Sequence, residues 1–449
     1  MSSWRNGRLA DEVSELEAGV SVNADDRSRG VGEVGVLKTS AVSGGVFDEK
    51  ENKAIWPREV ARARVAVEGD SILISRMNTP ALVGESAYVA TAHLDLFLPD
   101  RIWLVRMHDR ERCCVRWLAH FLQSHRAKSF ISLNATGTSG SMKNLPKSRL
   151  LAMPVAWPTP IEQRRIADIL DTLDEVIHTT EQIIAKLQHV KQGLLYDLLT
   201  RGLDENGELR DPMRHPEQFK DSPLGIVPAD WRVTHLGDVV PRAVYGVSVP
   251  LELGGNGIPV LRMNNLSDGE AELSELKYSA SRKARELLLR PGDILFNRTN
   301  SIEHVGRTGI WRGQLEQASF ASYLVRLDPD PSRLNGEFLC RWLNWLPTQI
   351  RIRRFATPGV QQVNINPTNL RKVTIALPTS MKEQQAIVSI LTTLDARLAS
   401  ELAERCKLDA LKSGLSEDLL TGRVNVKRFG LNGSTSAEAR SLDQVGLPL

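Results

Sequence analysis

The chain has 449 residues, of which 41% are hydrophobic and 25% are charged, an ordinary balance for a globular protein. At about 150 residues per domain, this length suggests roughly three domains. The net charge of +3 is too small to select among nucleic acid, membrane and metabolite partners. Composition therefore excludes a mostly disordered chain and leaves the function open.

The start of the chain is polar and lacks the apolar core of a signal peptide, and no apolar run approaches the roughly 18 residues of a transmembrane helix. The four cysteines, Cys113, Cys114, Cys340 and Cys406, show no CxxC or Cys/His ligand spacing. We therefore expect a cytoplasmic protein with incidental thiols and no metal site.

Residues 1–155 predict the first domain, of mixed α/β (α+β) class. A polar segment, Ser75–Thr79, is expected to follow a strand, and a helix is expected over Arg112–Ser129. A second polar segment, residues 137–143, comes after this helix.

Residues 156–203 predict a long helix, because apolar side chains recur in two series with a period of seven. At about 1.5 Å per residue, such a helix would be roughly 60 Å long. We expect its coiled-coil seam to contain Ile166, Ile169, Leu173, Val176, Ile183 and Leu187.

Residues 204–222 are polar, contain Gly, Pro, Asn and Asp, and predict a linker. Residues 223–378 predict a second mixed domain. Strands are expected over Ile258–Asn265 and Asp293–Phe296, and a mostly helical segment over Leu334–Phe355, broken near Pro347.

Residues 379–423 predict a second long helix, and residues 424–449 a frayed tail. Polar side chains at Arg397, Glu401 and Glu404 predict a weaker seam near the middle of this helix. The expected seam residues are Ile387, Ile390, Leu394, Leu408, Leu411 and Leu415.

The chain contains an internal duplication. Residues 162–200 and 383–421 align without a gap at an offset of 221 and are identical at 17 of 39 positions, counted along the sequence. A weaker match joins Trp4-Arg5 to Trp231-Arg232. The three-domain prior is therefore replaced by two copies of one domain-plus-helix unit. The two helices could pair as an antiparallel, pseudo-twofold coiled coil, or each could pack on its own domain.

Polar segments at equivalent places in the two copies are candidate DNA-reading loops. Arg, Asn and Gln make bidentate contacts to guanine and adenine edges, and Lys and Arg neutralise phosphates. The alternative is that these segments are ordinary solvated turns. The candidate DNA-binding residues are Arg76, Asn78, Lys143, Arg262, Asn264, Arg298, Asn300, Gln361, Gln362 and Asn364.

The sequence shows no Gly-Lys of a Walker A loop, no HExxH and no GxSxG, and we predict neither a catalytic residue nor a metal ligand. Two alternatives remain open. One is a metal-dependent nuclease that uses Asp48 or Glu275, each two residues before a lysine. The other is a coiled-coil scaffold that binds only protein.

Taken together, four features resemble the specificity (S) subunit of type I restriction–modification systems. They are two variable domains, GDIL-type strands (Gly292–Leu295, and Gly69–Leu73 with an inserted Ser71), Pro/Glu-Gln helix starts (158–163 and 378–384) and the helix ending Gly-Leu-x-x-Asp-Leu-Leu-Thr (193–200 and 414–421). The resemblance covers about residues 1–423.

This resemblance implies a non-catalytic subunit that serves DNA methylation and host defence. Each domain would act as a target recognition domain for one half of a bipartite site in double-stranded DNA. The helices would set the half-site spacing and dock two methyltransferase subunits, and restriction/translocase subunits would join them. This chain would bind no cofactor, and S-adenosylmethionine, ATP and Mg²⁺ would be bound by the partners.

Overall fold

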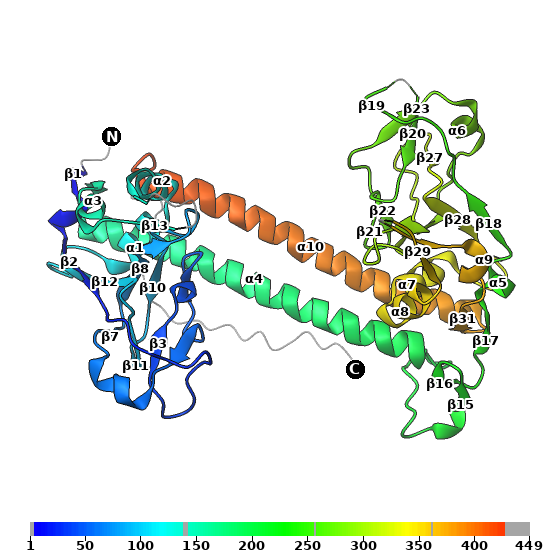
Figure 1. Ribbon diagram of the computed structural model, residues 1–449, viewed down its shortest axis with the longest axis horizontal. Helices are drawn as coiled ribbons and strands as arrows, with labels where there is room; N and C mark the ends of the chain where they lie inside the picture. Colours follow the sequence, from blue (N-terminus) through cyan, green and yellow to red (C-terminus); the bar gives the residue numbers. More distant parts are fainter. Residues whose placement is uncertain (1–3, 138–141, 256, 361, 427–449) are drawn as a thin grey trace, which may run out of the picture. The chain divides into compact units, whose positions relative to one another are not determined.

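The computed structural model describes residues 4–137, 142–255, 257–360 and 362–426 (Figure 1). The chain divides into unit 1, Met1–Glu181 with Ala403–Leu449, and unit 2, Gln182–Leu402. Each unit holds one mixed domain and half of each long helix, α4 (Pro160–Thr200) and α10 (Met381–Leu420). The predicted fold of two tandem mixed domains with two long helices is confirmed.

The domain of unit 1 contains two four-stranded sheets and a helical pair. The antiparallel sheet has the order β10-β8-β12-β2, and the other has the order β6-β3-β11-β7 with a parallel β3–β11 pair. The strands and helices are β2 (Val13–Ala18), β3 (Gly35–Leu37), β6 (Asn52–Ala54), β7 (Ala66–Val67), β8 (Ser71–Ser75), β10 (Ser86–Val89), β11 (His93–Phe97), β12 (Ile102–Met107), α1 (Val115–Gln123) and α2 (His125–Asn134). Trp103 of the sheet and Trp117 of α1 are both buried in its core.

The domain of unit 2 repeats this topology. Its larger sheet has the order β18-β28-β24-β26-β22-β21, so its first four strands match β2-β12-β8-β10. The second sheet has the order β19-β23-β20-β27. The elements are β18 (Arg242–Tyr245), β19 (Glu252–Leu253), β20 (Ile258–Leu261), β21 (Leu266–Ser267), β22 (Glu270–Ala271), β23 (Lys277–Ser279), α6 (Arg282–Glu286), β24 (Ile294–Asn297), β26 (Thr308–Ile310), β27 (Ser319–Phe320), β28 (Leu324–Asp328), α7 (Gly336–Asn344) and α8 (Leu346–Arg353).

The predicted helix break near Pro347 occurs two residues earlier. Trp345 has an extended ψ of 130° and separates α7 from α8. Pro347 lies in the first turn of α8, where the missing N–H has no helical partner to lose.

The first and last strands of each domain pair with one another. β1 (Arg5–Arg8) is antiparallel to β14 (Pro154–Trp157), and β17 (Arg232–His235) is antiparallel to β31 (Thr374–Leu377). Because β14 and β31 directly precede the long helices, this pairing fixes the start of each domain beside its helix. It accounts for the weak repeat at Trp4-Arg5 and Trp231-Arg232.

A buried glutamine at the start of each long helix holds it to its domain. The side chain of Gln384 donates to the carbonyls of Arg333 (3.0 Å) and Pro378 (2.8 Å) and accepts from the N–H of Asn335 (2.8 Å). Its equivalent in unit 1, Gln163, bonds the carbonyls of Arg112 and Pro158 and the N–H of Cys114. The repeated Glu-Gln motif is thus a docking element.

The segment 204–222, predicted to be a linker, contains regular structure. Leu203 and Leu209 are paired in an isolated antiparallel β-bridge, and β15 (Phe219–Ser222) pairs with β16 (Gly225–Pro228). Arg210 is buried and pairs with Glu383 at 2.7 Å. Several of the Gly, Pro, Asn and Asp residues of this segment do lie in turns, but apolar and charged residues between them, such as Leu209 and Arg210, contact other residues of unit 2.

The two long helices lie side by side and antiparallel within each unit (Figure 1). In unit 1, Lys412 of α10 pairs with Asp174 of α4. In unit 2, Lys191 of α4 pairs with Asp395 of α10 at 2.6 Å. Both lysines and both aspartates are related by the 221-residue offset. Such reciprocity is typical of an isologous contact between like elements.

The second series of the predicted seam is wrong by one residue. Val176, Ile183 and Leu411 are 43%, 36% and 50% exposed, whereas Ile169 and Ile390 are partly buried against their own domain cores. The first series holds the seam as expected. The first series comprises Ile166, Leu173, Thr180 and Leu187 on α4 and Ile387, Leu394, Leu408 and Leu415 on α10, all buried or half-buried. The second line of the seam is formed instead by Leu170, Ile177 and Ile184 on α4 and by Leu391, Leu398 and Leu419 on α10, which are also buried or half-buried.

The error has a physical reason. On α4, the residues three positions after the first series (Ile169, Val176, Ile183) and those four positions after it (Leu170, Ile177, Ile184) are all apolar. The sequence of α4 alone therefore does not show which of these two rows faces α10. On α10 the corresponding choice is between Leu398, which is half-buried, and Arg397, which is exposed. Burial of leucine rather than arginine selects the spacing of four.

The weak centre expected on α10 is present, but of the three polar residues predicted there only Glu401, at the position of Thr180, is on the seam, whereas Arg397 and Glu404 are exposed. Arg405 is the second polar side chain of the centre and pairs with Glu181 at 2.7 Å.

This register predicts a difference between neighbouring residues. Leu391 is fully buried, so Leu391→Ala should lower the free energy of unfolding by about 2–5 kcal/mol, as large-to-small core substitutions do. Ile390→Ala, at a partly buried site, should cost clearly less. Urea unfolding of the full chain measures both. A larger loss from Ile390→Ala would contradict the assigned seam.

Candidate nucleic-acid interface

The structure joins the two polar segments of each domain into one small sheet. In unit 1, β9 (Met77–Asn78) pairs with β13 (Lys143–Asn144), which sets Lys143 opposite Asn78. In unit 2, β25 (Thr299–Asn300) pairs with β30 (Val363–Ile365), and β29 (Ala356–Pro358) pairs with β30 from its other side. Segments more than 50 residues apart in sequence therefore form one polar surface in each unit.

A third polar segment joins the small sheet of unit 2. The side chain of Asn297 donates to the carbonyl of Met263 at 3.0 Å, and Gln362 lies 3.9 Å from the Met263 sulfur. The turn that carries Arg262 and Asn264 therefore lies beside β25 and β30. Asn264 is exposed there, and Arg262 donates to the carbonyl of Glu275 at 2.7 Å.

Arg298 is engaged inside the domain. Its guanidinium donates to the carbonyl of Ser322 (3.1 Å) and to the side-chain oxygen of Asn364 (3.0 Å), and it lies 5.0 Å from the centre of the Tyr245 ring. These contacts hold Asn364, on the central strand of the small sheet, in one orientation. In this geometry Arg298 supports the small sheet through its hydrogen bond to Asn364.

Arg76 has the same place in unit 1. Its guanidinium carbon lies 5.8 Å from the centre of the Trp103 ring, and its carbonyl accepts from the N–H of Leu145, directly after β13. Both repeated arginines thus stack on an aromatic ring and support the small sheet. The aromatic rings come from different strands, β12 and β18.

The other candidate residues lie at the edges of the small sheets. Asn78 and Asn300 accept from the next backbone N–H, at 2.9 Å and 2.8 Å, and Lys143 donates to the carbonyl of Gly137 at 3.1 Å. Gln361 lies outside the described residues.

A shallow hollow of about 660 Å³ lies over the small sheet of unit 2. It is polar and holds no ionisable side chain among its lining residues, Thr299, Thr357, Pro358, Gly359, Val360, Gln362, Val363 and Asn364. Such an open, neutral surface offers hydrogen-bond groups to an extended ligand. Sequence reasoning missed Thr357 and Tyr245, since neither belongs to a charged or amide-rich run.

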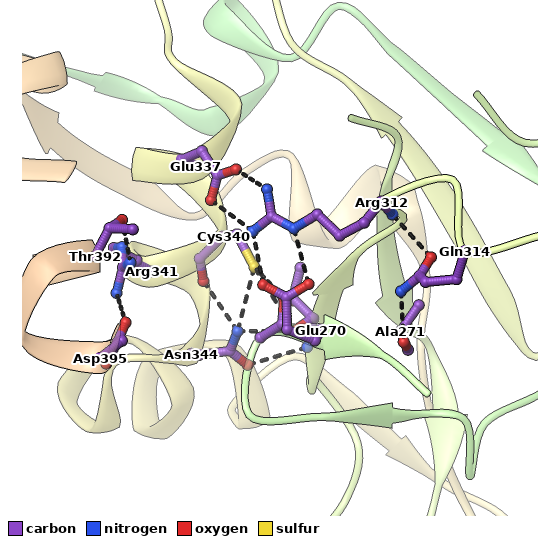
Figure 2. Close-up of polar contacts among 12 residues, drawn as sticks. Glu270, Ala271, Arg312, Gln314, Glu337, Cys340, Arg341, Asn344, Thr392 and Asp395 are labelled. Carbon is purple, nitrogen blue, oxygen red and sulfur yellow. Dashed lines mark hydrogen bonds and ion pairs between the residues drawn. The ribbon is translucent and has the colours of Figure 1, made fainter. Parts of the chain in front are cut away.

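In unit 2, an ion-pair cluster joins the domain to α10 (Figure 2). Arg341 of α7 bonds Asp395 (2.7 Å) and Thr392, and Arg312 bridges the carboxylates of Glu270 and Glu337. Burial alone would raise the pKa of Asp395, but its bonds to Lys191 and Arg341 hold that pKa below its ordinary value. The contact between the domain of unit 2 and α10 therefore contains a carboxylate, Asp395, whose charge is compensated by Arg341 and Lys191.

Cys340 lies beside this cluster, and burial raises the pKa of its thiol to about 12. A thiol with so high a pKa stays protonated at neutral pH and is a poor nucleophile or metal ligand. The residue behaves as a packed core side chain, as expected from the sequence.

The residues proposed for a nuclease do not form a metal site. Asp48, in unit 1, accepts the N–H of Lys50 in a turn, and Glu275, in unit 2, has a turn φ of 49°. Within the described ranges, no group of three His, Cys, Asp or Glu side chains is placed to hold a metal ion. In the same ranges, no helix has the length and apolar character needed to span a membrane.

Two mixed domains, each with a repeated polar sheet and each docked on paired helices, define a duplicated recognition protein. The family model described as "Type I restriction modification DNA specificity domain" matches residues 1–189 and 228–408. The chain therefore belongs to the type I restriction–modification DNA specificity family, as the helix motifs predicted.

Known relatives agree with this assignment. The chain is 26% identical over 308 residues to the type I restriction enzyme MjaVIII specificity subunit of Methanocaldococcus jannaschii, covering 67% of this chain and 69% of the relative. It is 23% identical over 361 residues to the StySPI specificity subunit of Salmonella potsdam, covering 79% and 73%. Another M. jannaschii relative, 28% identical, is matched over only 49% of its own length.

Solved structures share the fold. A crystal structure of the type I restriction–modification system S subunit from M. genitalium has a TM-score of 0.56 at 16% identity, covering 93% of this chain and 96% of that one. A structure from a study of complex assembly and conformational transition of the type I system has a TM-score of 0.52 at 19% identity, covering 94% and 98%.

Proposed function

We propose that this chain is the non-catalytic DNA sequence-specificity subunit of a type I restriction–modification complex, and that each domain reads one half of a bipartite target. The observation that carries this proposal is the small polar sheet repeated at equivalent places in both domains. Its amide side chains suit the donor and acceptor pattern of base edges in the major groove.

The long helices are proposed to act as the spacer and as the docking surface for two methyltransferase subunits. Helices of 41 and 40 residues, at about 1.5 Å per residue, would be roughly 60 Å long. This length would limit the half-site separation to under two turns of duplex, at about 34 Å per turn. S-adenosylmethionine, ATP and Mg²⁺ would be bound by the methyltransferase and restriction/translocase partners in the cytoplasm.

The decisive experiment is a methylome. The full chain is co-expressed with the methyltransferase subunit of its own host, and adenine and cytosine methylation is mapped across the genome. We expect one bipartite motif that disappears when this chain is omitted. A complex that forms without any methylated motif would instead indicate a protein-only scaffold.

Domain exchange sharpens the test. Replacing residues 1–155 with the corresponding domain of a relative should change the bases of one half-site and leave the other half unchanged. If both halves changed, the assignment of one domain to one half-site would be wrong.

A further inference from the structure

The last turn of α8 carries three arginines, Arg351, Arg353 and Arg354, that the candidate reading surface does not use. Arg354 is exposed and lies two residues before β29, the edge strand of the small sheet. Arg353 donates to the carbonyl of Glu303 at 3.1 Å, in the loop that follows β25. The cluster therefore borders the polar surface of unit 2 directly.

These cations lack carboxylate partners. Among the described residues, no ion pair within 4.0 Å includes any of the three arginines. Arg351 donates to the carbonyl of Pro347 at 3.2 Å, its guanidinium carbon lies 6.0 Å from the centre of the Trp345 ring, and its Nη1 is buried without a hydrogen-bond partner in the same residue set. Burial, followed by the charge of Arg354, lowers the pKa of Arg351. Like charges held together in this way favour an anion beside them.

The nearest acidic side chains do not neutralise the turn. Asp268 and Glu303 share with Arg353 and Arg307 the rim of a hollow of about 310 Å³. The hydrogen bond with Ser301 is the first cause of the lowered pKa of Glu303, and the charges of His304 and then Arg353 lower that pKa further. Arg353 and Arg354 therefore keep charge available to an outside ligand.

The equivalent turn in unit 1 is uncharged. Ala135-Thr136 aligns with Ala356-Thr357 at the offset of 221, which sets Phe130, Ser132 and Leu133 at the positions of the three arginines. Ile131 and Ile352, between them, are both buried, so the two turns are structural equivalents. The three positive charges are thus present in one copy of a shared scaffold and absent from the equivalent positions of the other.

We infer that the C-terminal turn of α8 is a phosphate-binding surface for the backbone of the DNA that unit 2 reads, an inference that rests on the proposed function. Arginine guanidinium groups bind phosphate oxygens through charge-assisted, often bidentate hydrogen bonds. Contacts to the backbone carry no base information, so this surface sets affinity and register while β25 and β30 supply selectivity. Unit 2 gains at this turn an electrostatic anchor that the equivalent turn of unit 1 lacks.

The test compares two charge-matched variants of the full chain, studied with the methyltransferase partner when the two copurify. The test variant is Arg353→Gln with Arg354→Gln, and Arg351 is kept because it is half-buried. The control is Lys283→Gln with Arg285→Gln on α6, two exposed cations that lie far from α8 in Figure 1. Fluorescence anisotropy measures binding to a duplex without the target motif across a salt titration.

Each phosphate contact contributes about 0.9 to the slope of log K against log salt. The test variant should therefore have a slope shallower by about 1.8 and an affinity at low salt reduced by tenfold or more. The control should match the parent chain, and the methylated motif should be the same for all three. Equal slopes for parent and test variant, an equal loss in the control, or no salt-dependent binding by the parent would overturn the inference.

The outcomes separate this inference from the function on which it rests. If the test variant had a shallower salt slope but no bipartite methylation were found, the phosphate-binding inference would stand and the proposed specificity function would be rejected. If the arginines met an acidic protein partner instead, the test variant would weaken complex formation while the DNA slope stayed unchanged, and the inference would fail.

Discussion

Replacing Gln384 by alanine is expected to destabilise unit 2 by about 3 kcal/mol. The side chain is fully buried and makes three hydrogen bonds, two to Arg333 and Asn335 in the segment before α7 and one to Pro378 just before α10. Its removal leaves the carbonyls of Arg333 and Pro378 and the N–H of Asn335 without partners. Each buried group left unsatisfied costs roughly 1–3 kcal/mol, and partial relaxation offsets some of the sum.

The neighbouring residue supplies the control. Gln385 is exposed, so Gln385→Ala should stay within about 0.5 kcal/mol of the parent chain. Urea unfolding gives the size of both effects, and hydrogen exchange shows where they occur. For Gln384→Ala we expect faster exchange at the start of α7 and α10, and for Gln163→Ala the same effect at α1 and α4. Equal stability of the Gln384 and Gln385 variants would show that the buried bonds do not hold the helix.

The duplication was visible in the sequence and left two arrangements open for the long helices, and the structure shows them antiparallel and side by side within each unit (Figure 1). An offset of 221 that keeps Lys191 with Lys412 and Asp174 with Asp395 is the pattern expected when two like helices pair with each other. The ion pairs between these residues follow from it. Repeats are informative because a contact between two equivalent elements occurs twice where both of its residues are repeated.

The seam register and the segment 204–222 were predicted less well for a shared reason. Val176 and Ile177 are equally apolar, and only the side chains of α10 decide which of them is covered. Likewise, Arg210 in a polar segment resembles any solvated arginine until Glu383, 173 residues later, lies beside it. A residue whose contact partner is distant in sequence shows no local sequence pattern that would predict its burial or its ion pair.

The same limit applies to the recognition surface. The repeat located both polar segments of each domain, and the structure shows that these segments pair. The sequence could not show that Arg298 and Arg76 are turned inward, because their aromatic partners, Tyr245 and Trp103, are not equivalent residues of the repeat. Arg76 and Arg298 stay candidate DNA-binding residues, and their contacts with Trp103 and Asn364 also place them to support the small sheets.

This geometry leads to a reciprocal prediction for the two arginines. Arg298→Ala should release Asn364 and reduce discrimination at the second half-site by about tenfold, because a good bidentate base contact is worth about 1–3 kcal/mol. Discrimination at the first half-site should be unchanged. Arg76→Ala should do the reverse, since it supports the small sheet of unit 1. The measurement is the methylation rate of duplexes with single base changes in either half of the mapped motif.

Tyr245 separates a positioning role from a general loss of stability. Tyr245→Phe keeps the ring that lies 5.0 Å from Arg298 and should leave discrimination in place, whereas Tyr245→Ala should lower it in the second half-site only. A purely structural effect would lower the total rate for every duplex and leave the ratio between matched and mismatched duplexes unchanged. If Arg298→Ala relaxed both half-sites, or if the ratios stayed constant, the inward-turned arginine would have no part in recognition, and the reading residues would have to be sought elsewhere on the domain.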